Sequence, residues 1–71
     1  MEFFIVVEGD ERTGYSAYVP SLEGVYATGR TERVVRSRIS SGIAYHIAKL
    51  REAGQPVPTP PARVIQIDVA V

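Results

Sequence analysis

The feature that most constrains this chain is an early apolar run in which both sides of a strand are apolar. The run from Phe3 to Val7 is rich in β-branched and aromatic residues, so a first strand is predicted over Glu2 to Glu8. Successive side chains of a strand point to opposite faces, so the odd-numbered residues of the run face one way, whereas Phe4 and Val6 face the other. The strand therefore needs apolar cover on two sides.

Three more strands and one helix are predicted after this run. The strands are Tyr15 to Val19, Val25 to Thr28 and Arg63 to Val71, and the helix is Glu32 to Ala53. Between the first two strands, Gly9 to Gly14 is polar and is typical of a hairpin loop. After the helix, Gln55 to Pro61 contains four prolines and predicts an extended connector. The order is β-β-β-α-β.

The helix has a start signal, a stop signal and one apolar stripe. Thr31 is a good N-cap, and Gly54 suits the left-handed position after the last turn. The stripe repeats at helical spacing and consists of Val35, Ile39, Ile43, His46 and Leu50. A crossover helix returns the fourth strand parallel to the first. We therefore expect one α+β domain over residues 1–71, a four-stranded mixed sheet with the helix packed on one face.

One helix leaves the second face of such a sheet without cover. Phe4, Val6, Tyr18 and Tyr26 are expected on that face, where contiguous apolar side chains typically mark an interaction surface. We expect a protein interface there, and specifically a homodimer with this face inside; the alternative is that the connector and loops fold over it. A stripe of small residues on the opposite side of the helix is either a second contact or plain solvent-facing surface. Its members are Ser37, Ser41, Ala44 and Ala48.

Composition narrows the function further. A chain of 71 residues folds as a marginally stable domain, which usually needs a disulfide, a metal or a partner subunit. It has no cysteine and a single histidine, so association with another subunit is the remaining way to gain stability, and we expect no cofactor and no metal.

The formal charge is zero, which argues against nucleic acid as the main ligand. The longest apolar run is too short to span a bilayer, so a cytoplasmic protein is expected. Seven arginines against one lysine, with no asparagine, hint at a thermophilic or GC-rich source.

No catalytic set is found in the sequence. His46 lies within the apolar helix stripe, so a packed histidine is favoured over a catalytic one. Among the acids, only Glu8 and Asp68 could pair across the sheet. Arg30 and Arg33 belong to a basic helix start that could contact phosphates or an acidic partner, although a solvated surface explains it as well. The alternatives to a protein-binding module are a remnant of a metal-dependent nuclease and a standalone RNA-binding domain.

Three blocks of the sequence resemble the HicB family of antitoxins. They are Tyr15 to Gly24 with its Pro-Ser-Leu-Glu-Gly ending, Gly29-Arg30-Thr31 at the helix start, and Arg51 to Pro58 with its Gly-Gln-Pro-Val-Pro tail. The resemblance implies a partial ribonuclease H-like fold. It also implies neutralisation of a small basic HicA-type toxin, an mRNA interferase, and it carries no catalytic residue. Many family members continue into a DNA-binding domain, whereas this chain ends at Val71, so DNA binding is not expected.

Overall fold

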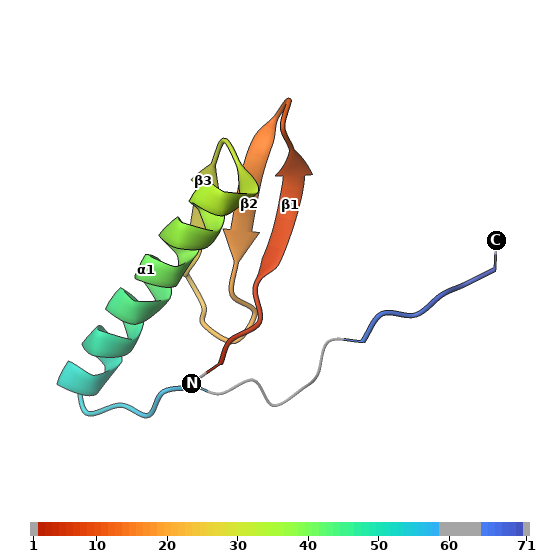
Figure 1. Ribbon diagram of the computed structural model, residues 1–71. Helices are drawn as coiled ribbons and strands as arrows, with labels where there is room; N and C mark the ends of the chain where they lie inside the picture. The colour runs from red at the N-terminus through yellow and green to blue at the C-terminus, as the bar shows by residue number, and fades with distance from the viewer. Residues whose placement is uncertain (1, 59–64, 71) are drawn as a thin grey trace.

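The computed structural model describes residues 2–58 and 65–70 and consists of a small sheet with one long helix (Figure 1). Its elements, in chain order, are β1 (Val6–Asp10), β2 (Gly14–Tyr18), β3 (Tyr26–Gly29) and α1 (Glu32–Glu52). The strands pair in the order β1-β2-β3, both pairs antiparallel. Among the described residues the molecule is therefore a two-layer α+β domain, as the sequence predicts for the first three strands and the helix.

The β1–β2 hairpin is closed by the side chain of one aspartate. One carboxylate oxygen of Asp10 accepts hydrogen bonds from the backbone amides of Arg12 and Thr13, both at 2.9 Å, and from the Thr13 hydroxyl at 3.0 Å. Short aspartate side chains that bind the backbone in this way favour turns. Gly14, with φ +86°, follows directly, in a conformation that favours glycine. The turn fixes the register, in which Asp10 pairs with Gly14 and Val6 with Tyr18.

The helix begins and ends as its sequence signals predict. The Thr31 hydroxyl accepts a hydrogen bond of 3.1 Å from the amide of Val34, which satisfies one of the free amides of the first turn. At the other end, Gly54 has φ +70° and the amide of Gln55 donates to the carbonyl of Leu50 at 2.9 Å. These bonds satisfy carbonyls that the end of the helix leaves free. The prediction of a helix over Glu32 to Ala53 is confirmed to within one residue, because Ala53 is the C-cap.

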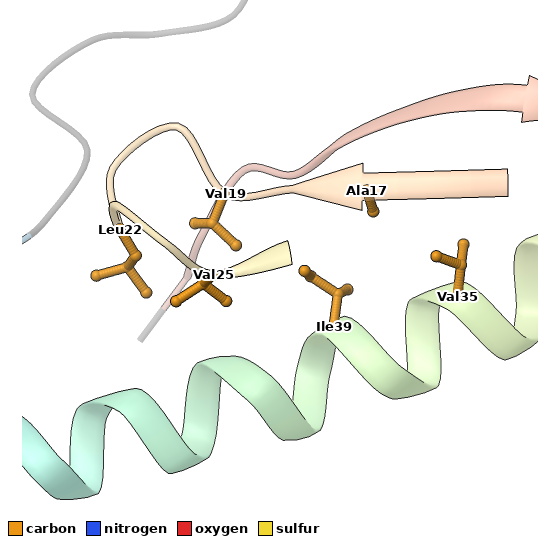
Figure 2. Close-up of a cluster of buried hydrophobic side chains, with 6 residues drawn as sticks. All are labelled: Ala17, Val19, Leu22, Val25, Val35 and Ile39. Carbon is orange, nitrogen blue, oxygen red and sulfur yellow. The ribbon is translucent and has the colours of Figure 1, made fainter. Parts of the chain in front are cut away.

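The core lies between α1 and the face of the sheet that it covers (Figure 2). It consists of six buried residues: Ala17, Val19, Leu22, Val25, Val35 and Ile39. The loop between β2 and β3 supplies half of them, because the amide of Val19 donates to the Val25 carbonyl and folds the loop under the helix. This small core agrees with the marginal stability expected of so short a chain.

The helix extends beyond the sheet. Its 21 residues span about 31 Å, whereas a five-residue strand spans about 17 Å. Val35 and Ile39, in its first half, are buried, but the later members of the predicted stripe are only half-buried, because little of the sheet lies beneath them. These later members are Ile43, His46 and Leu50.

The predicted strand boundaries need small corrections. The first strand was expected over Glu2 to Glu8, but pairing begins only at Val6, because its partner β2 ends at Tyr18 and the chain turns away at Pro20. Pairing continues to Asp10, because the hairpin loop is tighter than the predicted Gly9 to Gly14. Val19 and Val25 join the turn rather than the strands.

The predicted fourth strand is not formed in the described part of the chain. Residues 65–70 have no strand partner, and Ile65, Ile67 and Val69 are 73%, 75% and 70% exposed. Figure 1 shows the segment separate from the sheet. Residues 63, 64 and 71, which also belong to the prediction, lie outside the described residues. Alternation of apolar residues makes a segment fit to be a strand, but a strand also needs an edge to pair with. The sheet is thus antiparallel throughout, and the mixed four-stranded arrangement is not confirmed.

Candidate protein-binding face

The strand register places three of the four residues predicted for the uncovered face in one row. Val6 pairs with Tyr18, and Tyr18 pairs with Tyr26, so these three side chains form one row across the three strands. Phe4 precedes β1; its neighbours Phe3 and Ile5 line a groove against α1, so Phe4 lies on the other side and is 44% exposed. The neighbour Ala17 is buried beneath the helix, so the row faces away from α1. We call Phe4, Val6, Tyr18 and Tyr26 the outer aromatic row.

The outer aromatic row is open to solvent. Tyr26 is 77% exposed, and Phe4 and Tyr18 are nearly half exposed. A shallow hollow beside the row is lined by both tyrosines together with Pro20 and Glu23. In the structure, none of the described residues covers this face in the way that α1 covers the other. Large aromatic side chains left open in a row are typical of the centre of a protein interface.

The surroundings of the row are polar and charged. The next row across the sheet consists of Glu8, Ser16 and Thr28, which pair in register. Glu23 lies at the hollow beside Tyr26. The polar row also lines a hollow whose walls include Arg12, Arg30 and Arg38. The face therefore combines apolar contact area with charges of both signs, which suits a partner whose charges complement them.

The structure separates the two arginines predicted at the helix start. Arg30 lies beside the polar row, in a hollow that also has Arg12 and Arg38 on its walls. Arg33 lines a different, shallow hollow with Glu32 and Arg36. The two predicted residues therefore do not form one basic site with each other, and neither belongs to the outer aromatic row.

A second surface was missed by the sequence reasoning. Because α1 packs on β2 and β3, the inner side of the segment before β1 is incompletely covered. A groove remains there, lined by the apolar side chains of Phe3, Ile5, Ile39 and Ile43 and by Arg36 and two serines. The alternation of the first strand correctly assigned Phe3 and Ile5 to the helix side. Nothing in the pattern revealed that the helix would lie too far toward β3 to cover them fully.

The residues considered as catalytic candidates in the sequence do not come together in the structure. His46 is half-buried on α1, and no hydrogen bond to it is found among residues 2–58 and 65–70. The pair of Glu8 and Asp68 is not formed, because Asp68 lies on the segment outside the sheet. Within the same residues no three potential metal-binding side chains gather.

The described helix does not combine the length and the apolar character needed to cross a membrane. The four small residues predicted in a row along the helix are all exposed; they are Ser37, Ser41, Ala44 and Ala48.

One comparison with known proteins is informative. Residues 3–69 match the model of a family described as the HicB_like antitoxin of bacterial toxin-antitoxin systems. The match covers nearly the whole chain and contains all of the sheet, the helix and the outer aromatic row. Comparison with curated proteins found no match, and comparison with solved structures found none.

Proposed function

Because this chain belongs to the HicB-like antitoxins of bacterial toxin–antitoxin systems, we propose that it neutralises a HicA-type mRNA interferase by binding it directly through the outer aromatic row. The observation that carries the proposal is the register of three strands that brings Val6, Tyr18 and Tyr26 into one open row. The chain acts by occupying the toxin's surface and takes no part in chemistry.

The chemistry of the face fits this partner. An enzyme that cleaves mRNA must present a basic surface to the phosphates of its substrate. Glu23, at the hollow beside Tyr26, offers a carboxylate to such a surface, and Glu8 in the next row shares its hollow with Arg12, Arg30 and Arg38. The aromatic side chains supply apolar contact that a phosphate backbone does not offer. Together they favour the toxin's substrate-binding side as the place where the antitoxin binds.

The test uses two tyrosines of similar exposure on different sides of the molecule. Tyr26, in the outer aromatic row, is 77% exposed, and Tyr45, on the helix, is 66% exposed. The chain is co-expressed with the product of a neighbouring short basic reading frame and purified by a tag on the toxin. Tyr26→Glu is expected to abolish co-purification and rescue of growth, whereas Tyr45→Glu retains both. If the unmodified chain is not retained, toxin neutralisation fails; if both variants bind equally, the outer face is the wrong site.

The same proposal includes an assembled state in the cytoplasm. We propose that the working form is a homo-oligomer and that assembly supplies the fourth strand of a partial ribonuclease H-like sheet. The open edge of β1 and the exposed segment of residues 65–70 support this. The sequence analysis placed the outer face inside a homodimer. If the toxin binds that face instead, the copies of the chain must associate through another surface.

A further inference from the structure

The two edges of the sheet differ in how well they are protected. At the β3 edge, α1 packs closely and the Arg38 guanidinium donates a hydrogen bond of 2.9 Å to the carbonyl of Thr28. The β1 edge has no neighbour among the described residues. Unpaired strand edges expose backbone amides and carbonyls that can accept another strand. The stretch from Phe3 to Val7, which leads into β1 and includes its first two residues, has no proline or charged residue that would prevent such pairing.

The groove beside this edge provides an apolar surface on which an added strand can pack. Phe3 and Ile5 from the edge and Ile39 and Ile43 from α1 line it. Of these four, only Ile39 is fully buried, so the groove is an unfilled extension of the core. A strand placed along β1 would cover it with every second side chain.

The chain contains one segment that fits both the edge and the groove. Residues 65–70 alternate Ile65, Ile67 and Val69 with Gln66, Asp68 and Ala70. The three large side chains are at least 70% exposed, and the six residues equal in number the stretch from Phe3 to Glu8. One side of the segment matches the apolar groove, and its polar side would continue the polar part of the outer face.

We propose that residues 65–70 of one copy pair with β1 of a second copy and fill its groove, and that the exchange is reciprocal. A twofold axis makes the exchange reciprocal, so that the β1 edge of each copy is paired.

The connector favours exchange over folding back. Four prolines lie between Gln55 and Pro61, and proline-rich segments are stiff and extended. In Figure 1 the C-terminal segment extends away from its own sheet. On its sequence alone, such a connector disfavours a tight return of the strand to its own sheet and favours pairing with another copy. The outer aromatic row takes no part in this exchange, so the dimer remains able to bind a toxin.

The first test measures mass with matched variants of the exchanged segment. Sedimentation of the purified full chain, without toxin, is expected to give 15.6 kDa, twice the 7.8 kDa of one chain. Ile67→Lys places a charge in the groove and is expected to halve the mass, whereas Gln66→Lys, on the polar side, leaves it at 15.6 kDa. A 7.8 kDa mass for the unmodified chain, or equal masses for the two variants, overturns the proposal.

The second test distinguishes exchange from folding back. The chain has no cysteine, so single cysteines report contacts unambiguously. Chains with Ser40→Cys, at the groove, are unfolded and refolded together with chains that contain Val69→Cys, and a short bismaleimide is added. Exchange gives a covalent dimer that contains one chain of each kind; replacing Ser40→Cys by Tyr45→Cys, on the other side of α1, removes it. If only a chain with both cysteines cross-links, and as a monomer, the segment folds back and the second copy is excluded. Both tests are independent of the toxin, so failure of toxin binding leaves them unaffected.

Discussion

Arg38, in the second turn of α1, donates a hydrogen bond of 2.9 Å from Nη1 to the backbone carbonyl of Thr28 at the outer edge of β3. This bond joins the helix to the sheet at a position where a further strand would otherwise pair. It adds to the apolar packing that holds the helix on β3, and it occupies one carbonyl of that edge. No such bond protects the edge of β1 in the described part of the sheet.

Removing the Arg38 side chain is expected to weaken the attachment of the helix. Arg38→Ala loses one hydrogen bond to an exposed carbonyl, which we expect to lower the free energy of unfolding by about 1 kcal/mol. Arg33→Ala, an exposed arginine on the same helix, is the control and is expected to change it by less than about 0.5 kcal/mol. Urea unfolding followed by circular dichroism measures both. Equal effects would show that the bond to Thr28 contributes nothing specific.

Two glycines are expected to respond in opposite directions to the same substitution. A Cβ at Gly29 would lie 2.9 Å from Val34 Cγ1 and 3.0 Å from the Val35 amide nitrogen, so Gly29→Ala pushes the helix away from β3. We expect a loss of about 1–3 kcal/mol. A Cβ at Gly42, inside the helix, would lie at an ordinary 3.6 Å from Val25 Cγ1. Gly42→Ala is expected to gain about 0.5–1 kcal/mol, because alanine restricts the unfolded chain more than glycine does. Thermal unfolding of the two variants checks the signs, and a stable Gly29→Ala variant would contradict the close approach.

The hairpin is expected to make the stability of the protein depend on pH in the acidic range. The backbone amide and the hydroxyl of Thr13, followed by the amide of Arg12, hold the pKa of Asp10 below its ordinary value of 3.8. A depressed carboxyl pKa contributes stability above the ordinary value and loses it as the pH falls through the lower folded value. Asp10→Asn is therefore expected to lower Tm at about pH 7 and to leave it nearly unchanged at about pH 2. Glu11→Gln, in the same loop, is the control. A constant difference between wild type and Asp10→Asn across this range would contradict the assignment.

A charge introduced on the outer face shows whether a toxin or a second copy of the chain binds there. With exchange at β1, Phe4→Glu is expected to retain the mass of a dimer and to lose toxin binding. The assignment made from the sequence alone, with this face inside the dimer, predicts instead that Phe4→Glu or Val6→Glu gives a monomer or an insoluble chain. Thr28→Glu, on the same face outside the outer aromatic row, is the control. Sedimentation and toxin co-purification on the same samples decide between the two.

The sequence predicted what depends on local signals. The Thr31 cap, the stop at Gly54 and the hairpin between the first two strands all use contacts within a few residues, and each was found where expected. The outer aromatic row was also predictable, because strand alternation is fixed by geometry. In contrast, the position of the helix over the sheet depends on long-range contacts such as that between Arg38 and Thr28, which no spacing reveals.

The fourth strand illustrates the limit of reading a pattern. Residues 65–70 have the alternation of a strand, but the pairing partner of a strand is not written in its own residues. The same limit hid the groove at Phe3 and Ile5, because full burial of these residues requires a segment from elsewhere. Both errors have one origin, since each concerns the β1 edge.

The order of the elements has a consequence for synthesis. Each strand pairs with its neighbour in the sequence, and the helix that covers them follows directly, so the described contacts of the folded body are largely local. Domains with local contacts fold fast, and folding can begin while a chain is still being made. The body can therefore form without residues 65–70. The β1 edge is then exposed on every newly folded chain, and how long it stays so depends on the concentration of other finished chains.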